Sequence, residues 1–247
     1  MRPVGLTPAQ LTAILRPWRA YGQPAYQRVA RQLEIEEEAA LLLIGCGEGY
    51  AVQWLATRVG AHLEGIDPDA EAVAAAAAQA RTEDVRPRPT YQAAPVSDLP
   101  YEAAVFDAVI VDLAALGADA AQPALAEAVR VTKDRAQLYC LAPVWIGEPS
   151  ARQRARVGEL GLRPRYVMEW KQMLREAGLV ELTVEELAAG EWLETSFVLT
   201  LVRGWRTARW RGAGLAFSGA YRALRSAILK KSLQLSLIWG TRWSNSE

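Results

Sequence analysis

The sequence is poor in the residues that bind metals and form disulfides. It has two cysteines and one histidine among 247 residues. Cys46 and Cys140 both lie inside apolar runs, so no disulfide framework is expected and a reducing, cytoplasmic compartment is predicted. Because His62 is the only histidine, a histidine-rich metal site is excluded, and we predict no metal cofactor.

Long apolar runs and a leader are lacking as well. No uninterrupted apolar run approaches the ~18 residues that cross a membrane, and the chain does not open with the basic and apolar stretch of a secretory signal. Apolar residues make up 51% of the chain and charged residues 23%, as in soluble globular proteins. The length suffices for one sizeable α/β domain, or for one domain with an appendage. The richness in Ala and Arg is typical of bacteria with GC-rich genomes.

The net charge is zero, but the two signs are unevenly distributed. Residues 1–202 hold 19 Lys or Arg and 27 Asp or Glu, whereas residues 203–247 hold nine and one. An acidic body with a basic tail suggests that the tail meets an anionic membrane, a nucleic acid or the acidic surface of the protein itself.

Predicted strands alternate with predicted helices along most of the chain. This alternation favours a doubly wound α/β sheet with mostly parallel strands. Residues 185–194, which join the last two predicted strands, are too few for a helical crossover, so we expect an antiparallel pair at the edge of the sheet. The predicted strands are Ala39–Ile44, His62–Ile66, Thr90–Ala94, Phe106–Val111, Gln137–Leu141, Leu179–Val184 and Thr195–Val202. The predicted helices lie in residues 7–33, with a break at Gly22–Pro24, and at Gly49–Val59, Asp69–Arg81, Ala120–Val131 and Glu169–Ala177, with a turn at Lys133–Ala136.

The stretch LLLIGCGEGY, Leu41 to Tyr50, places three glycines directly after a buried strand. Backbone without side chains lets main-chain N–H groups and the start of a helix approach a ligand, at the sheet edge where α/β proteins bind ligands. A dinucleotide fingerprint would need its third glycine at Tyr50, which disfavours a pyrophosphate site and a nicotinamide dehydrogenase. The second strand ends in GIDPD, so Asp67 is placed to accept hydrogen bonds from both hydroxyls of a ribose. The pattern therefore predicts a nucleoside site.

Four stretches, in this order and spacing, resemble the motifs of class I S-adenosylmethionine-dependent methyltransferases. They are LLLIGCGEG, LEGIDPDAEAV, VSDLPYEAAVFDAVIVD and LAEAVRVTKDRAQLYCLAP. The resemblance spans residues 25–202 and is strongest to the small-molecule subgroup that includes ubiquinone and menaquinone methyltransferases. It implies a Rossmann-like, mostly parallel seven-stranded sheet with an antiparallel last strand. We expect an N-terminal helical cap in residues 1–35, a methyltransferase core in 36–202 and a basic, helical C-terminal extension in 203–247.

The resemblance also implies S-adenosyl-L-methionine as cofactor and a set of residues that bind it. The first glycines of the loop would border its methionine part through their main chain, Asp67 would hold its ribose and Pro68 would pack near its adenine. The full expected set is Gly45, Cys46, Gly47, Gly49, Asp67, Pro68 and Val96. Two of these residues have a second interpretation: Asp67 also suits the cap of the next helix, and Cys46 also suits a buried packing position.

The sequence departs from the family pattern at two positions. The family usually has an acidic residue two places before the first glycine, which helps to hold the amino-acid end of the cofactor, and here Leu43 stands there. It also has an acidic residue near the end of the third strand, which bonds the adenine amino group, and here the aligned residue is Pro95. Each lost charged hydrogen bond costs about 1.5–3 kcal/mol. These departures favour weaker cofactor binding but leave the fold unchanged.

Asp112, which ends the fourth predicted strand, is the expected catalytic residue. The resemblance places it where methyl donor and acceptor meet, as a base or as a group that orients a cation. A cap of the following helix is the alternative. Asp107 lies at the start of the same strand and His62 at the start of the second, so both are expected at the edge away from the site. Without a histidine to act as general base, acceptors that need strong base assistance are not expected. Aromatic side chains that either line an acceptor pocket or pack helices are Tyr21, Tyr26, Tyr166 and Trp170.

The basic tail has the composition of a helix that lies on a membrane surface. An apolar stripe from Phe217 to Trp239 recurs at helical spacing, with tryptophans and cations around it. We expect peripheral contact with an anionic membrane through residues 205–243, or alternatively packing on the acidic body or a homodimer contact. A second cluster, from Arg152 to Arg165, also suits nucleic acid. That partner is not expected, because no RNA-binding module is present.

Three functions remain open from the sequence. The first is methyl transfer from S-adenosylmethionine to a small, apolar or membrane-associated acceptor. The second is a non-catalytic binding or assembly protein of the same fold, in which Leu43 and Pro95 mark a lost cofactor site. The third is an RNA or protein methyltransferase that uses the arginine clusters.

Overall fold

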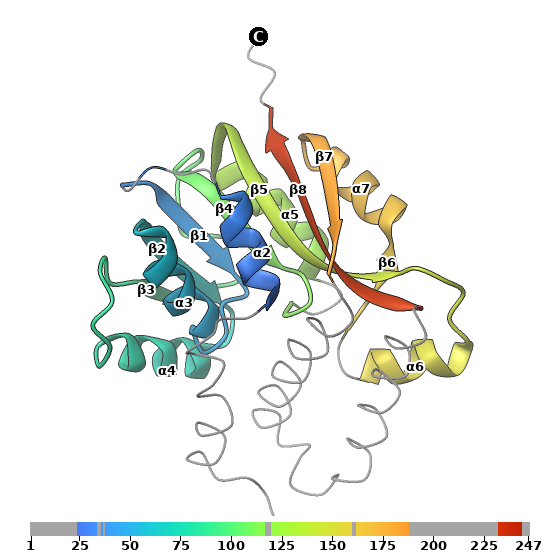
Figure 1. Cartoon of the computed structure of the whole chain (residues 1–247), viewed down its shortest axis with the longest axis horizontal. Helices are drawn as coiled ribbons and strands as arrows, with labels where there is room; N and C mark the ends of the chain where they lie inside the picture. Colours follow the sequence, from blue (N-terminus) through green and yellow to red (C-terminus); the bar gives the residue numbers. More distant parts are fainter. Residues whose placement is uncertain are drawn as a thin grey trace, which may run out of the picture.

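A central sheet with helices on both faces organises the chain (Figure 1). The computed structural model describes residues 24–33, 36, 38–116, 120–159, 162–187 and 232–243. Within these ranges the sheet has eight strands in the order β3-β2-β1-β4-β5-β8-β7, with β6 paired to β5 beside this path. The strands are β1 (Ala40–Ile44), β2 (His62–Asp67), β3 (Thr90–Ala93), β4 (Phe106–Asp112), β5 (Thr132–Trp145), β6 (Arg165–Tyr166), β7 (Leu179–Glu186) and β8 (Leu233–Arg242). The helices are α2 (Pro24–Gln32), α3 (Tyr50–Val59), α4 (Ala70–Ala80), α5 (Ala121–Val131), α6 (Ala151–Glu159) and α7 (Val167–Glu176).

The expected α/β sheet with an antiparallel last strand is confirmed. The strands from β1 to β6 pair in parallel, whereas β8 runs antiparallel to both of its neighbours, β5 and β7. Apart from the helical tail, the predicted strands and helices that fall on described residues are present, with ends that differ by a few residues. One such difference is at β5, which begins at Thr132. The turn expected at Lys133–Ala136 is a bulge inside this strand, where Arg135 has a φ of 62°.

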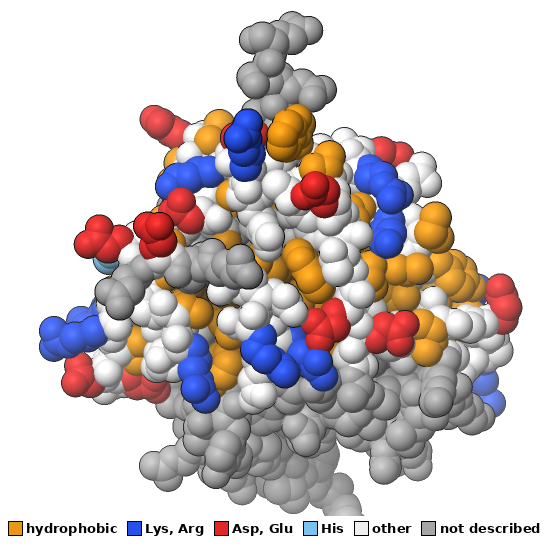
Figure 2. Space-filling model, turned by 45° about the horizontal axis from the view of Figure 1, so that its top comes forward, with side chains coloured by type: hydrophobic (Ala, Val, Ile, Leu, Met, Phe, Trp, Pro, Cys, Tyr) orange, Lys and Arg blue, Asp and Glu red, His pale blue; other side chains and the backbone are white. Residues whose placement is uncertain are grey.

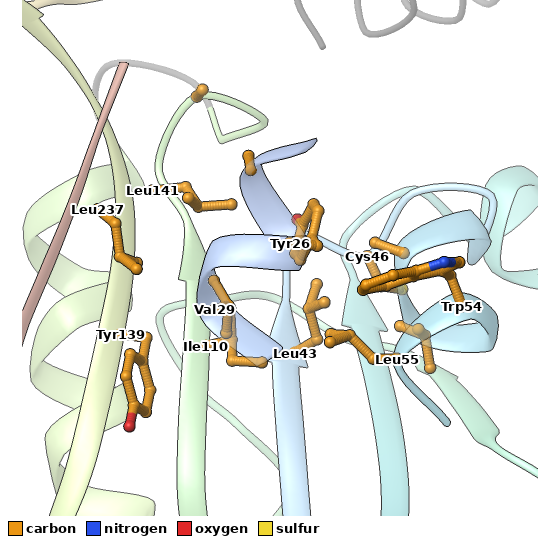
Figure 3. Close-up of a cluster of buried hydrophobic side chains, with 14 of the residues drawn as sticks. Tyr26, Val29, Leu43, Cys46, Trp54, Leu55, Ile110, Tyr139, Leu141 and Leu237 are labelled. Atoms are coloured by element: carbon orange, nitrogen blue, oxygen red, sulfur yellow. The ribbon is translucent and has the colours of Figure 1, made fainter. Parts of the chain in front are cut away.

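The alternation of side chains along β1 produces a core on each face of the sheet. Leu41 and Leu43 belong to one cluster, with α2 and α3, while Leu42 and Ile44 belong to another, with α5 and α7. Because successive strand residues point to opposite faces, a strand that is covered on both sides must be apolar at every position. Figure 3 shows the first cluster, in which Tyr26 of α2 lies over Leu43.

The strand between β5 and β7 comes from a part of the tail that was expected to be helical. The helix expected to continue to Trp239 is wrong for residues 233–242, which form β8. In β8, Leu237 packs in the cluster of α2 and α3, and the adjacent Ile238 packs in that of α5 and α7. Neighbouring residues on opposite faces fit a two-residue repeat and not a helical one. The strand expected at Thr195–Val202 lies outside the described residues.

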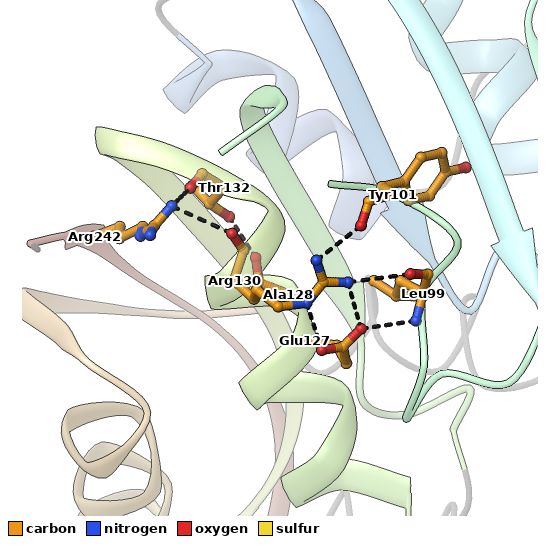
Figure 4. A network of polar contacts seen from close by, with 7 residues as sticks. All are labelled: Leu99, Tyr101, Glu127, Ala128, Arg130, Thr132 and Arg242. Carbon is orange, nitrogen blue, oxygen red and sulfur yellow. Dashed lines mark hydrogen bonds and ion pairs between the residues drawn. The ribbon is translucent and has the colours of Figure 1, made fainter. Parts of the chain in front are cut away.

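A polar network ties the end of β8 to the junction of α5 and β5 (Figure 4). The guanidinium of Arg242 donates to the main-chain oxygens of Thr132 and Arg130. Arg130 in turn pairs with Glu127 at 2.7 Å and donates to the main-chain oxygen of Tyr101 at 2.8 Å. These bonds hold residues 233–242 as part of the core sheet. The limits expected for the N-terminal cap and the C-terminal extension stay predictions.

The described surface carries both signs of charge. On the face in Figure 2, acidic and basic side chains are interspersed, whereas nucleic-acid binding favours a surface of positive charge. Of the helices in the described ranges, none has the length and apolar character needed to cross a membrane. The same part of the chain holds no group of three or more His, Cys, Asp or Glu residues arranged to bind a metal.

Candidate functional site

Three of the expected site features meet at one edge of the sheet. β2, β1 and β4 are parallel neighbours, so their carboxyl ends lie together. The glycine loop, residues 45–49, follows β1, while Asp67 ends β2 and Asp112 ends β4. The glycine loop, Asp67 and Asp112 therefore lie at the same edge of the sheet, as the sequence predicts.

The glycine loop exposes its main chain at one position and packs tightly at two others. Gly45, Gly47 and Gly49 all have positive φ, of 85°, 52° and 79°, a region that glycine adopts without strain. A Cβ on Gly45 would lie 3.3 Å from the main-chain oxygen of Asp112, and one on Gly49 would lie 2.7 Å from the Cβ of Ala76. A Cβ on Gly47 would meet no atom within 4 Å. Gly47 is thus the point at which a ligand can approach the bare main chain.

The Asp67 carboxylate lies against this exposed position. Its Oδ2 accepts a 2.8 Å hydrogen bond from the N–H of Gly47, and its Oδ1 accepts a 2.9 Å bond from the N–H of Asp69. The expectation that Asp67 caps the next helix is wrong. The cap of α4 is Asp69, whose Oδ1 accepts from the N–H groups of Glu71 and Ala72. Asp67 therefore serves the loop and not the helix.

Asp112 forms a buried pair with a tyrosine from α2. Its side chain is 3% exposed, its Oδ1 accepts from the N–H of Ala115 at 2.8 Å, and its Oδ2 accepts from the hydroxyl of Tyr26 at 2.8 Å. Burial and the nearby carboxylate raise the pKa of Tyr26 well above its usual value, so the phenol stays protonated and donates. Asp112 does not cap α5, whose N-cap residue is Ala120. It caps the turn that directly follows β4.

The two cysteines lie in the interior. The thiol of Cys46 packs beside Gly65 of β2, where a Cβ would lie 3.0 Å from its Sγ, and it donates to the main-chain oxygen of Gly47 at 3.7 Å. Cys140 is fully buried in β5, and burial raises its pKa. Both fit the packing interpretation of the sequence.

Tyr91 of β3 packs against the loop, a role that the sequence analysis did not predict. Its hydroxyl donates to the main-chain oxygen of Gly49 at 3.3 Å. Its ring occupies the space left by Gly49 and Gly65, since a Cβ on either would lie under 3.0 Å from it. Gly49 and Gly65 are the sequence features that leave room for this ring, but their relation to Tyr91 follows only from the strand register, in which Gly65 pairs with Tyr91.

The remaining residues expected near the cofactor fall in two groups. Pro68 is exposed next to Asp67, and Pro95 is exposed in the loop after β3. Val96 is 6% exposed and packs in the cluster of α5 and α7, so its side chain faces the core. Leu43 is fully buried in β1. Leu43 and Pro95, which stand where the family usually has acidic residues, therefore contribute no carboxylate to the site.

The aromatic residues proposed to line an acceptor pocket mainly serve packing. Trp170 of α7 is 2% exposed, and its indole N–H donates to the main-chain oxygen of Pro143 at 2.9 Å. Tyr166 is partly exposed beside Arg154 and Glu148. Tyr21 lies outside the described residues.

The opposite edge of the sheet holds the residues expected to be structural, and a pocket. His62 begins β2 there, and Asp107 is the second residue of β4. Asp107 pairs with Lys133 at 2.7 Å, and the hydrogen bond from Lys133 lowers its pKa. A pocket of about 420 Å³ is lined at this edge by Asp107, Gln137 and Tyr139, among others. It lies away from the glycine loop.

Comparison with known proteins finds a family model similar to the middle of the chain. Residues 42–140 match the family model of a methyltransferase domain, and this range contains the glycine loop, Asp67 and Asp112. Residues 42–140 are therefore similar to a methyltransferase domain. This match agrees with the resemblance of the sequence to class I S-adenosylmethionine-dependent methyltransferases and does not distinguish the subgroup.

Solved structures share the fold of this chain at low sequence identity. Geranyl diphosphate C-methyltransferase from Streptomyces coelicolor, with S-adenosyl-L-homocysteine bound, has a TM-score of 0.71 and 17% identity over 95% of this chain and 84% of its own. Phosphoethanolamine N-methyltransferase 2 from Haemonchus contortus, with S-adenosyl-L-methionine bound, has a TM-score of 0.73 and 14% identity over 98% and 59%. The cyclase SpnF has a TM-score of 0.71 and 20% identity over 92% and 84%.

A relative in sequence covers a smaller part of the chain. An uncharacterized protein of Haemophilus influenzae is 27% identical over 147 residues, which are 58% of this chain and 59% of the relative. The match therefore spans less than two thirds of the relative's length.

The residues at the loop fit S-adenosylmethionine in two respects. The bare main chain at Gly47 leaves room for a ligand, and the adjacent Asp67 carboxylate supplies an acceptor for ribose hydroxyls. Leu43 supplies no acceptor for the amino-acid end of the cofactor.

Proposed function

We propose that this chain transfers the methyl group of S-adenosylmethionine to a small-molecule acceptor. The observation that carries the proposal is the open main chain at Gly47 beside the Asp67 carboxylate, at the carboxyl edge of a methyltransferase domain. The glycine loop would hold the cofactor through its main chain, with Asp67 on the ribose. Gly45, Cys46, Gly49, Pro68 and the main chain of Val96 would complete the site.

In this reaction the protein acts mainly by positioning the cofactor and the acceptor. The sulfonium of the cofactor supplies a methyl group on a good leaving group, so alignment of the acceptor atom with the methyl carbon and the sulfur contributes most of the rate. Asp112 is poorly suited to be a free general base, because both of its oxygens already accept hydrogen bonds. The proposal therefore favours acceptors that are reactive at neutral pH.

An apolar or membrane-associated acceptor remains a narrower form of this proposal. The apolar stripe of the tail was the reason to expect such an acceptor, but two of its residues face the protein. Leu235 is buried in β8, and Trp239 stacks on Tyr139 with ring centroids 6.4 Å apart. Contact with an anionic membrane therefore depends on residues 205–231. Membrane contact and homodimer formation both stay predictions, as does a cytoplasmic location.

A non-catalytic protein of the same fold is the second candidate. Leu43 and Pro95 favour it, because neither can accept the hydrogen bonds that the family pattern assigns to those positions. Both candidates share the architecture and differ in whether the cofactor binds.

Calorimetric titration with S-adenosylmethionine separates the two. We expect the native chain to bind the cofactor and Asp67→Ala to weaken binding by about tenfold or more, since a charged hydrogen bond contributes about 1.5–3 kcal/mol. Asp84→Ala is the matched control, because the Asp84 side chain is 90% exposed and this residue is not part of the glycine loop. Absence of binding by the native chain at millimolar cofactor would favour the non-catalytic candidate.

A further inference from the structure

A buried amide without a hydrogen-bond partner lies in the helix that follows the glycine loop. Gln53 of α3 is 4% exposed, and its Nε2 is the one buried side-chain nitrogen or oxygen atom without a partner in the part of the chain that the structure describes. Its Oε1, by contrast, accepts a 2.8 Å bond from the Nε2 of Gln79 in α4. Unpaired buried donors cost free energy and are rare in folded proteins, so this amide group needs an explanation.

Gln53 and Tyr91 meet at the main-chain oxygen of Gly49. This oxygen accepts a 2.9 Å bond from the main-chain N–H of Gln53, at the start of α3, and a 3.3 Å bond from the Tyr91 hydroxyl. Hydrogen bonds between oxygen atoms are usually about 2.7–2.8 Å long, so the bond from Tyr91 is a long one. Gly49 therefore joins the loop to two side chains, one with a long hydrogen bond and one with an unpaired donor.

The Gln53 amide lies beside the Tyr91 hydroxyl. Burial raises the pKa of Tyr91, so its phenol stays protonated, while the Gln53 side chain acts in the opposite direction. A neighbouring donor lowers the pKa of a phenol, and Nε2 is the donor of the Gln53 side chain. The two groups are therefore adjacent, although they form no hydrogen bond with each other in this structure.

The position of Gly49 controls the part of the loop that a ligand meets. Its N–H donates to the main-chain oxygen of Cys46 at 3.0 Å, and this turn encloses Gly47, where the main chain is open. The Tyr91 ring fits so closely against Gly49 that a Cβ there would lie 2.7 Å from it. A small movement of this ring therefore moves Gly49 and, with it, the turn that carries Gly47.

We propose that Gln53 and Tyr91 are positioning residues for the cofactor. In the bound state, the amide of Gln53 donates to the Tyr91 hydroxyl oxygen, and the hydroxyl donates to Gly49 at a shorter distance, which fixes the turn around Gly47. The proposal rests on the proposed function, because it assumes that S-adenosylmethionine binds at the glycine loop. A ligand favours the conformation to which it binds more tightly, so a bond that the free chain lacks adds to the affinity for the cofactor.

The test compares affinity with stability in variants of three side chains. Dissociation constants for S-adenosylhomocysteine are measured by calorimetry, and resistance to unfolding is measured by urea denaturation without ligand. Gln53→Leu removes the unpaired donor with little change in size, and Tyr91→Phe removes only the hydroxyl. Gln79→Leu is the matched control, because it removes the bond to Oε1 of Gln53 and leaves Nε2 and Tyr91 in place.

We expect affinity and stability to separate in Gln53→Leu. It should bind S-adenosylhomocysteine about three to ten times more weakly than the native chain, while its urea midpoint stays the same or rises, because the free chain loses an unpaired buried donor. Tyr91→Phe should weaken binding by a similar factor, and the double variant should bind no more weakly than either single one. Gln79→Leu should show the reverse pattern, a lower urea midpoint with unchanged affinity, since it leaves Oε1 of Gln53 unpaired.

Three results would overturn the proposal. In the first, Gln53→Leu binds S-adenosylhomocysteine as tightly as the native chain, so the amide has no role in binding. In the second, Gln53→Leu loses affinity and urea resistance together, as a residue with only a structural role does. The third is an unchanged affinity in Tyr91→Phe, which decides the question even if Gln53→Leu does not fold. Failure of the proposed function looks different, because the native chain itself then does not bind S-adenosylhomocysteine.

Discussion

The main-chain N–H of Gly47 donates a 2.8 Å hydrogen bond to the carboxylate of Asp67, 20 residues further along the chain. This bond joins the loop after β1 to the end of β2. The N–H of Asp69 donates to the other oxygen of the same carboxylate. Main-chain donors from two loops therefore set the position of Asp67, and the negative charge is fixed beside the open face of Gly47 before any ligand arrives.

Gly49 is required for packing, and its replacement should destabilise the fold more than replacement of a glycine with the same backbone conformation. We expect Gly49→Ala to lower the free energy of unfolding by about 2–4 kcal/mol, from overpacking against Ala76 and Tyr91 together with strain at positive φ. Gly60→Ala is the control, since it has a φ of 66° but no atom within 4 Å of a Cβ, and it should lose about 1–2 kcal/mol. Urea denaturation measures both values, and equal losses would contradict the packing role of Gly49.

Leu237 tests whether residues 233–242 belong to the core. Leu237→Ala should lower the free energy of unfolding by about 2–5 kcal/mol, because it leaves a cavity in a fully buried site. Gln234→Ala, at a half-buried position of the same strand, should cost less than about 1 kcal/mol. A loss for Leu237→Ala as small as that for Gln234→Ala would show that this segment does not lie in the sheet.

The sequence predicted well the parts of the fold that local patterns determine. β1 is a continuous apolar run, α4 has five consecutive alanines, and the loop glycines need positive φ. Each of these signals depends on neighbours within a few residues. The order of elements and the place of the site follow from them, because parallel strands bring their carboxyl ends together.

The parts that the sequence did not predict depend on contacts between distant residues. The run Leu235–Trp239 is apolar at most positions, and periodicity alone does not separate a buried strand from a helix in so short a run. Its assignment follows from pairing with β5, which is about 100 residues away. The bond from Tyr26 to Asp112 spans 86 residues. Nothing near either residue in the sequence indicates it.

The ion pair between Glu127 and Arg130 should make stability depend on pH in the acid range. The hydrogen bond from Arg130 holds the pKa of Glu127 below its usual 4.5. Because the folded pKa is lower than the unfolded one, the pair stabilises the fold above pH 4.5, and this contribution is lost as the pH falls through the folded pKa. The difference in urea midpoint between the native chain and Glu127→Gln should therefore narrow on acidification.

The exposed Glu102 provides the matched control for that measurement. Glu102→Gln should leave the urea midpoint close to that of the native chain across the same pH range, since surface substitutions usually change stability by less than about 0.5 kcal/mol. A midpoint difference for Glu127→Gln that stays constant from neutral pH to pH 3 would contradict the role given to the ion pair.

A crystal structure of the chain with S-adenosylhomocysteine tests the central claim most directly. The account predicts the ribose hydroxyls within hydrogen-bond distance of the Asp67 carboxylate and the amino-acid end along Gly45–Gly47, next to Asp112. The structure offers a different position for comparison, the pocket of about 420 Å³ at the opposite edge beside Asp107 and Gln137. Density for the nucleoside in that pocket, or a glycine loop without ligand at saturating concentration, would contradict the account.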